Sequence, residues 1–165
     1  MKFQDLFEIG MKRPVPNIVR PDGRVLNLGA GNSPISNTIS LDLPHWNAET
    51  DSIPYDDEDV DGIIACHFLE HLRSEHVIKV LRECERVLMP GGTMTIVVPH
   101  RLGALAYQDL DHKTFFNEDT WQCLFKNDYY DKNREQPWQF HIGFSMICGL
   151  NERNLSLFTQ LHKIP

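Results

Sequence analysis

The sequence predicts an α/β fold with a mainly parallel sheet and a closing antiparallel hairpin. Three observations lead to this prediction. A short apolar run, VLNL at 25–28, breaks into the turn Gly-Ala-Gly, and a second short run then ends in Asp42. The mostly apolar run VDGIIAC at 60–66 is typical of a strand that is buried on both faces of a sheet. Near the end of the chain, two strand-like runs are separated by a few polar residues.

Length and composition indicate one globular domain. A chain of 165 residues can bury a core without disulfides or metals, and 41% hydrophobic with 24% charged residues is ordinary for such a domain. The net charge of −7 argues against a nonspecific nucleic-acid binder, which would need a basic stripe. Four widely spaced cysteines without a CxxC pair predict free thiols in the reducing cytoplasm. Because the N-terminal residues contain no long apolar run, we expect neither a secretory signal nor a membrane span.

The first half of the chain contains two short strands in close succession. We expect them at 24–28 and 38–41, after a short amphipathic helix and a Pro-rich connector in 1–23. Only NSPISN lies between the two strands, which is too short for the crossover helix that usually joins parallel strands. A loop or single turn is therefore expected there. The acidic loop that follows has room for a short strand at 48–51.

The clearest helix follows the strand at 60–66. Ser74 is its expected N-cap, and the Pro-Gly-Gly run at 90–92 is expected to end it. Its apolar residues recur at helical spacing on one face: Val77, Val80, Leu81, Cys84, Val87 and Leu88. The next strand is expected at 93–99.

The remaining elements lie beyond an irregular polar and aromatic segment at 100–116. The run NEDTWQCLF at 117–125 predicts a short helix with Asn117 as its cap. Two strands within 139–150 and 154–163 are then expected to form the hairpin that closes the sheet.

This order of elements, with the motifs RVLNLGAGNSP, ISLDLP and RVLMPGGTM, resembles the class I S-adenosylmethionine-dependent methyltransferases. The likeness is to the small, single-domain, methyltransferase type 11-like kind, and it covers roughly residues 24–125. It implies a Rossmann-like sheet with helices on both faces and a first crossover helix that is short or absent. The resemblance also implies one domain over 1–165, divided as follows: N-terminal helix and connector 1–23, cofactor-binding core 24–99, acceptor-side segment 100–138, closing hairpin 139–165.

The resemblance implies S-adenosylmethionine as the cofactor and assigns residues to it. The carboxylate of Asp42 can accept hydrogen bonds from both ribose hydroxyls, and the glycines of the turn let a ligand approach the backbone. Asp51 is the first candidate for the adenine amino group, and Glu49 is the second. The full set of expected cofactor contacts is Asn27, Gly29, Ala30, Gly31, Asp42, Asp51, Ile53, Cys66 and His67.

The acceptor side is expected in PHRLGALAYQDLDHKTFF at 99–116, which follows the last parallel strand. Methyl transfer needs an acceptor lone pair in line with the sulfur–methyl bond and, where the acceptor carries a proton, a base. His112 is our first candidate base, and His100 and Tyr107 are candidate acceptor contacts. The alternative for His112 is that it only ties Asp109 or Asp111 to the loop. No Asn-Pro-Pro-Tyr motif follows the strand at 60–66, which argues against amino methylation of DNA bases. The resemblance implies a small molecule or a sugar as the acceptor.

Two alternatives remain open from the sequence. The first is a noncatalytic nucleoside-binding or interaction protein on the same fold, since a fold does not guarantee chemistry. The second is a zinc hydrolase, because His67-Phe-Leu-Glu70-His71 spells HxxEH. That motif straddles a strand end and contains the Leu-Glu-His that the methyltransferases carry here, so we expect no metal. A nicotinamide site fits poorly because Pro34 stands where the third glycine of GxGxxG belongs. The sequence gives no prediction of the oligomeric state.

Overall fold

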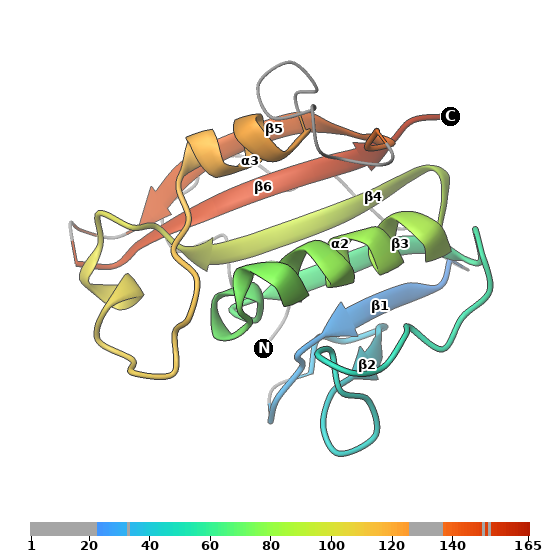
Figure 1. Ribbon diagram of the computed structural model, residues 1–165, viewed down its shortest axis with the longest axis horizontal. Helices are drawn as coiled ribbons and strands as arrows, with labels where there is room; N and C mark the ends of the chain where they lie inside the picture. Colours follow the sequence, from blue (N-terminus) through green and yellow to red (C-terminus); the bar gives the residue numbers. More distant parts are fainter. Residues whose placement is uncertain (1–22, 33, 126–136, 150, 152) are drawn as a thin grey trace.

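The computed structural model describes residues 23–32, 34–125, 137–149, 151 and 153–165, and these contain one six-stranded sheet. The strand order is β2-β1-β3-β4-β6-β5 (Figure 1). The strands are β1 Val25–Leu28, β2 Ile39–Leu41, β3 Val60–Cys66, β4 Leu88–Pro99, β5 Phe140–Gly149 and β6 Leu155–Lys163. The first four are parallel to one another, whereas β6 runs antiparallel to both β4 and β5. The predicted α/β sheet with its closing hairpin is therefore confirmed.

The two described α-helices lie over the same face of this sheet (Figure 1). Helix α2 (Ser74–Val87) crosses in front of β3 and β4, and α3 (Glu118–Phe125) packs on the hairpin. Two short 3-10 turns, η1 (Leu69–His71) and η2 (Ala104–Ala106), follow the ends of β3 and β4. The helix expected within 1–23 lies outside the described residues. No described helix has the length and hydrophobicity needed to cross a membrane.

The main core fills the space between the sheet and these helices. The predicted apolar face of α2 is buried there, with Leu81 and Cys84 fully enclosed. From α3, Trp121 and Phe125 stack in the same cluster. The opposite face of the sheet carries two smaller groups: Val97 and Phe158 in one, and Val25, Ile35 and Ile64 in the other. Burial of alternate strand residues on the two faces explains why β3 and β4 are apolar almost throughout.

Helix ends and loops show where local signals decide the structure. Asn117 caps α3 as expected, because its Oδ1 accepts a hydrogen bond from the Thr120 amide at 3.1 Å. The Asn117 amide donates in return to Oγ1 of Thr120, also at 3.1 Å, as in a capping box. Between β1 and β2 the described residues contain turns and no helix, in agreement with the short connection.

Three boundaries differ from the prediction. Helix α2 begins at Ser74, so Arg73 stands at the N-cap without a side-chain hydrogen bond. Residues 48–51 form a turn instead of a strand. The run at 90–92 lies inside β4, since the chain is already extended at Leu88. The register with β3 shifts there, and Gly91 adopts a left-handed φ of 78°, so the glycines accommodate an irregularity in the sheet.

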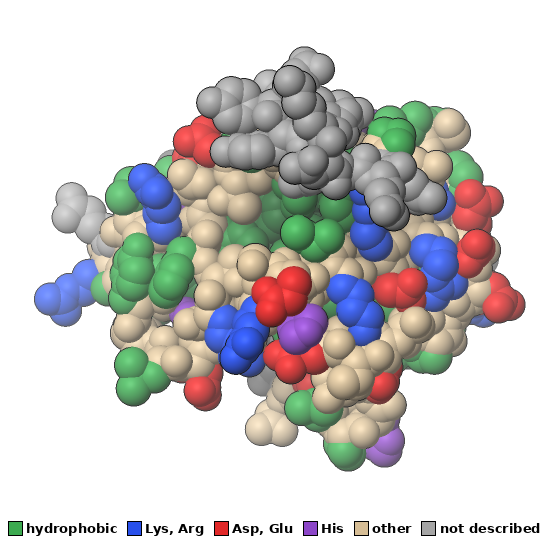
Figure 2. All heavy atoms as spheres, viewed as in Figure 1, with side chains coloured by type: hydrophobic (Ala, Val, Ile, Leu, Met, Phe, Trp, Pro, Cys, Tyr) green, Lys and Arg blue, Asp and Glu red, His purple; other side chains and the backbone are tan. Residues whose placement is uncertain are grey.

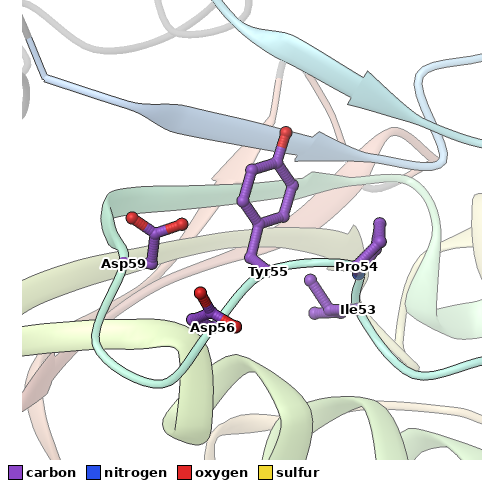
Figure 3. Close-up of a pocket in the computed structure, with 5 residues that line it drawn as sticks. All are labelled: Ile53, Pro54, Tyr55, Asp56 and Asp59. Carbon is purple, nitrogen blue, oxygen red and sulfur yellow. The ribbon is translucent and has the colours of Figure 1, made fainter.

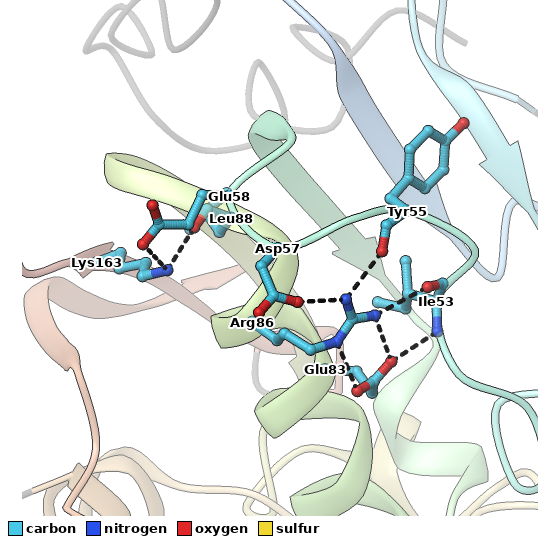
Figure 4. A network of polar contacts seen from close by, with 8 residues as sticks. All are labelled: Ile53, Tyr55, Asp57, Glu58, Glu83, Arg86, Leu88 and Lys163. Carbon is cyan, nitrogen blue, oxygen red and sulfur yellow. Dashed lines mark hydrogen bonds and ion pairs between the residues drawn. The ribbon is translucent and has the colours of Figure 1, made fainter.

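A polar network holds the loop before β3 against α2 (Figure 4). Arg86 donates to the carbonyl oxygens of Ile53 (3.0 Å) and Tyr55 (2.9 Å), and it also pairs with Asp57 and Glu83. Glu83 in turn accepts a hydrogen bond from the Ile53 amide at 2.8 Å. The loop is thereby fixed at the amino end of β3.

A small pocket of about 360 Å³ adjoins this loop (Figure 3). Tyr55 reaches from the loop towards β1, where the Arg24 guanidinium lies 5.3 Å from its ring centre. Because this pocket is at the amino ends of the parallel strands, it is at the opposite edge from the place where α/β sheets bind their ligands.

Candidate cofactor and acceptor site

The Gly-Ala-Gly turn after β1 opens the candidate site. Gly29 and Gly31 both have left-handed backbones, with φ of 63° and 53°. A Cβ at Gly29 would overlap the ring of Phe68, whereas a Cβ at Gly31 would meet no atom within 4 Å. The two glycines therefore serve different purposes. Gly29 makes room for a side chain of the protein, and Gly31 borders open space.

Asp42 lies directly beside this turn. The parallel register that pairs Leu28 with Leu41 brings the end of β2 next to the end of β1. One carboxylate oxygen of Asp42 accepts the Gly31 amide at 2.7 Å, and the other accepts the Leu43 amide at 2.8 Å. A carboxylate offers about four lone pairs, so two remain for further donors. These free lone pairs suit the two hydroxyls of a ribose.

A cleft of about 520 Å³ extends from Asp42 past the carboxyl ends of the neighbouring strands. Its volume is within the usual range of small-molecule sites, roughly 300–1,000 Å³. Aromatic surface comes from Trp46 and Phe68. The polar and charged lining residues are Asp42, Asn47, Glu49, His67, His71 and Lys113.

Three of the predicted cofactor contacts line this cleft: Gly29, Asp42 and His67. His67 follows β3 in a left-handed conformation with φ of 51°, which is uncommon for a residue with a side chain. Its amide donates to the carbonyl of Val97 at 2.8 Å, so a sheet-like bond holds this conformation. Its ring projects into the cleft rim and is 44% exposed.

Of the two adenine candidates, Glu49 lines the cleft and Asp51 does not. The carboxylate of Asp51 accepts hydrogen bonds from the Asn47 amide and the Thr50 hydroxyl, which lower its pKa and stabilise the turn. Glu49 lies 3.3 Å from Nζ of Lys113, and this hydrogen bond lowers the pKa of Glu49. The structure thus places the second candidate, and not the first, at the cleft.

Three other predicted cofactor contacts are packed in the sheet or the core. Asn27 is 3% exposed in the middle of β1, and Ile53 is 2% exposed. The Ile53 amide is engaged by Glu83, as described above. Cys66 packs against the face of the sheet that carries Val97, and burial raises the pKa of its thiol to about 12. The remaining predicted contact, Ala30, lies in the turn and is half-buried.

The predicted acceptor residues are dispersed. His100 is 2% exposed, and both of its ring nitrogens are used. Nδ1 accepts the Leu102 amide at 3.3 Å, which leaves Nε2 to donate to Glu118 at 3.0 Å. This arrangement joins the end of β4 to α3. Tyr107 is exposed and stacks on Phe115, with ring centres 4.8 Å apart.

His112 lies behind the wall of the cleft. Its Nδ1 is 3.0 Å from the carbonyl oxygen of Ala106, and because a carbonyl only accepts, Nδ1 carries the proton. The lone pair of the neutral ring is therefore on Nε2, which is 3.9 Å from Asp109. The His112 ring packs edge-on against the cleft residue His71, with ring centres 4.9 Å apart.

Sequence reasoning missed several lining residues of the cleft. Trp46 and Phe68 were not identified, although each is an aromatic residue shortly after a strand end. Lys113 was also missed, since nothing in its sequence neighbourhood shows that it reaches Glu49. His71 appeared only as part of the HxxEH motif.

Comparison with known proteins agrees with this geometry. Residues 28–96 match the model of a family described as a methyltransferase domain. This part of the chain is therefore similar to a methyltransferase domain. The described residues fit S-adenosylmethionine, since Asp42 has free lone pairs beside an open turn and a cleft of suitable size.

Solved structures with the same fold are methyltransferases. One from Methanosarcina mazei is 15% identical with a TM-score of 0.66, and the match covers 90% of this chain and 95% of that one. The putative methyltransferase of Haloferax volcanii, solved with the Trm112 activator, is 16% identical with a TM-score of 0.62, covering 89% and 84%. Phosphoethanolamine N-methyltransferase 1 of Haemonchus contortus is 16% identical with a TM-score of 0.62, covering 87% of this chain and 39% of that one. At these identities the likeness establishes the fold. No curated protein matches the chain in sequence.

Proposed function

We propose that this domain transfers a methyl group to an oxygen or nitrogen atom of a small-molecule acceptor, with sugars among the candidates. The observation that carries the proposal is one cleft whose lining includes Asp42 and Gly29 of the glycine turn together with His67, His71 and Lys113. Its lining residues include the hydrogen-bond acceptors that a nucleoside needs, and also donors and lone pairs that suit a polar acceptor.

Within this cleft, Asp42 is proposed to hold the ribose hydroxyls. We favour Glu49 over Asp51 as the residue nearest the adenine amino group, because Glu49 faces the cleft and the oxygens of Asp51 are engaged in the turn. Trp46 and Phe68 supply apolar surface against which a flat base can pack.

The chemistry asks the protein mainly to orient the acceptor. Bound S-adenosylmethionine supplies an already activated methyl group. His67, His71 and Lys113 can hold a polar acceptor by hydrogen bonds, which converts a bimolecular encounter into a positioned one. The predicted base His112 has its lone pair on Nε2, and a lone pair there can take a proton or coordinate a cation.

A small acceptor agrees with the charge of the surface. Figure 2 shows basic, acidic and histidine side chains intermingled over the middle of one face, without a continuous basic stripe there. Near the cleft, Lys113 and His76 both lie close to Glu49, so the negative carboxylate offsets the positive charge there. A polyanionic nucleic acid would be poorly attracted to such a surface.

The test is calorimetric titration of the purified protein with S-adenosylhomocysteine, with NAD as the control ligand. We expect micromolar binding of S-adenosylhomocysteine and none of NAD. Turnover of labelled S-adenosylmethionine is then measured with a panel of small hydroxyl, amine and sugar acceptors. Absence of S-adenosylhomocysteine binding by folded protein would overturn the cofactor assignment. Binding without turnover on any acceptor, nucleic acids included, would favour the noncatalytic alternative.

A further inference from the structure

We propose that Glu70, His71 and His112 bind a divalent transition-metal ion at the wall of the cofactor cleft. Each of the three side chains offers one ligand atom, and these atoms all lie within 4.8 Å of one another. Two imidazoles and one carboxylate form a ligand set of the kind that holds catalytic zinc, and the same donors suit manganese, iron or nickel.

Glu70 supplies a second and independent observation. Its side chain is buried, with 1% exposure of the residue. One carboxylate oxygen, Oε1, is 3.2 Å from Nδ1 of His67. The other, Oε2, is buried and has no hydrogen-bond partner among the described residues. A buried carboxylate oxygen without a partner is costly, and a bound cation beside it would satisfy it.

The ligands are held in place by the backbone. The amides of Lys113 and Thr114 both donate to the carbonyl oxygen of Glu70, at 2.7 and 3.1 Å. The Thr114 hydroxyl adds a bond to the carbonyl oxygen of Leu72 at 2.7 Å. These bonds join the segment after η2 to η1. His112 is therefore already held against His71 by the protein itself.

The protonation pattern of His112 is also the one that a ligand requires. Its Nδ1–H is bonded to the carbonyl oxygen of Ala106, which leaves the Nε2 lone pair for a ligand bond; Oδ2 of Asp109 lies 3.9 Å from this nitrogen. Metal-binding histidines usually donate their other ring N–H to a backbone carbonyl or a carboxylate in this way. No hydrogen bond engages the His71 ring within the described part of the chain, so its nitrogens are also available.

The position of the cluster suggests what the ion would do. His71 lines the cleft, so the open coordination positions of an ion with three protein ligands would face it. An acceptor hydroxyl or carboxylate oxygen could then occupy such a position, and coordination would lower the pKa of a hydroxyl. This last step rests on the proposed methyl transfer, whereas metal binding does not. The proposal replaces our expectation that the chain binds no metal.

The experiment uses the full chain after treatment with a chelator and dialysis, without cofactor or acceptor. Zn²⁺ and Mn²⁺ are each titrated alone by calorimetry, and the visible spectrum of the Co²⁺-loaded protein reports on its ligands. We expect one site per chain, with at least one of the ions binding at micromolar concentration. His112→Ala and Glu70→Gln should each weaken this binding at least tenfold, and His141→Ala, a histidine on the distant β5, should not change it.

Thermal unfolding with and without the metal separates a ligand from a structural residue. If Glu70 is a ligand, Glu70→Gln removes a buried charge whose Oε2 has no partner, and the amide oxygen can still accept from Nδ1 of His67. The metal-free variant should therefore keep its melting temperature but lose the stabilisation by the metal. A fall in melting temperature that is the same with and without metal would overturn the proposal. Wild-type binding no tighter than that of both variants would also overturn it. S-adenosylhomocysteine binding, measured in parallel, shows separately whether the cofactor assignment holds.

Discussion

At the scale of single residues, the site is built from side chains whose hydrogen-bonding capacity is only partly used. Asp42 accepts two backbone amides and has lone pairs left over. Asp51 and His100 were also candidates from the sequence, but their polar atoms are already engaged within the protein. The residues best suited to a ligand are therefore those that the fold leaves incompletely satisfied.

Replacing Asp42 tests the cofactor site directly. We expect Asp42→Ala to weaken S-adenosylhomocysteine binding by about 1–3 kcal/mol, because hydrogen bonds to a charged group are lost. Asp42→Asn retains one acceptor oxygen and should lose less. Calorimetry on both variants measures the effect, with Asp56→Ala at the opposite edge of the sheet as the control. Equal affinity of Asp42→Ala and the parent protein would contradict the assignment.

The two glycines of the turn should respond differently to alanine. Gly29→Ala places a Cβ into the Phe68 ring at a left-handed residue, so we expect a loss of about 2–4 kcal/mol in the free energy of unfolding. Gly31→Ala should lose only about 1–2 kcal/mol in the free energy of unfolding, because the left-handed backbone is strained but no atom is overlapped. Urea unfolding of the two variants gives the comparison. The same two substitutions are then made in a Phe68→Ala background. There Gly29→Ala should cost less than in the parent protein, because the ring that it overlaps is gone, and Gly31→Ala should cost the same. An equal reduction for both glycines would refute the explanation.

At the scale of elements, a loop or helix is positioned by a few polar contacts with a distant segment. Arg86 and Glu83 on α2 hold the loop before β3, and Lys163 at the end of β6 donates to Leu88 at the start of β4 (Figure 4). The carbonyl of Glu70 holds the segment that carries His112. Such contacts hold these segments in place, and they are not visible in the sequence pattern.

The network of Arg86 should make the protein sensitive to acid. The hydrogen bond from Arg86 lowers the pKa of Glu83 below its ordinary value of 4.5, so the unfolded chain binds a proton on this group more readily than the folded chain. The stabilisation is therefore present above pH 4.5 and is lost as the pH falls through the lowered pKa. In Glu83→Gln, we expect the free energy of unfolding to decrease less steeply as the pH is lowered. Urea unfolding from neutral pH down to about pH 3 measures this dependence. Glu75→Gln on the exposed start of α2 is the control, and the same slope in both variants would contradict the prediction.

At the scale of the whole molecule, one core between the sheet and its two described helices supports the cleft. Residues from α2, α3 and all six strands belong to this single cluster. The cleft lies at the edge where the carboxyl ends of β1, β2 and β3 meet, so its geometry depends on the packing of the entire sheet. Loss of core packing should therefore lower the free energy of unfolding even where the contacts of the site stay intact.

Two residues of α2 make this testable. Leu81 is fully buried, whereas Ile78 is 42% exposed on the same helix. We expect Leu81→Ala to lower the free energy of unfolding by about 2–5 kcal/mol, because it leaves a cavity in the core. Ile78→Ala should cost much less, since the side chain is already partly in water. Chemical denaturation measures both, and similar losses would show that α2 does not pack as described.

The sequence by itself determined the succession of strands along the parallel core, the glycine turn, the place of Asp42 at a strand end and the cap at Asn117. These follow from interactions between residues close in the chain: apolar periodicity, turn preferences and a short connection that brings two strand ends together. Boundaries within β4 were missed because a bulge can absorb Pro-Gly-Gly inside a strand. Only the tertiary structure decided that Glu49, and not Asp51, faces the cleft. It also decided that His100 is hydrogen-bonded to Glu118 and that His112 lies close to Glu70 and His71. Those outcomes depend on hydrogen bonds between segments far apart in the chain, and no local pattern specifies which polar atoms such bonds will leave free.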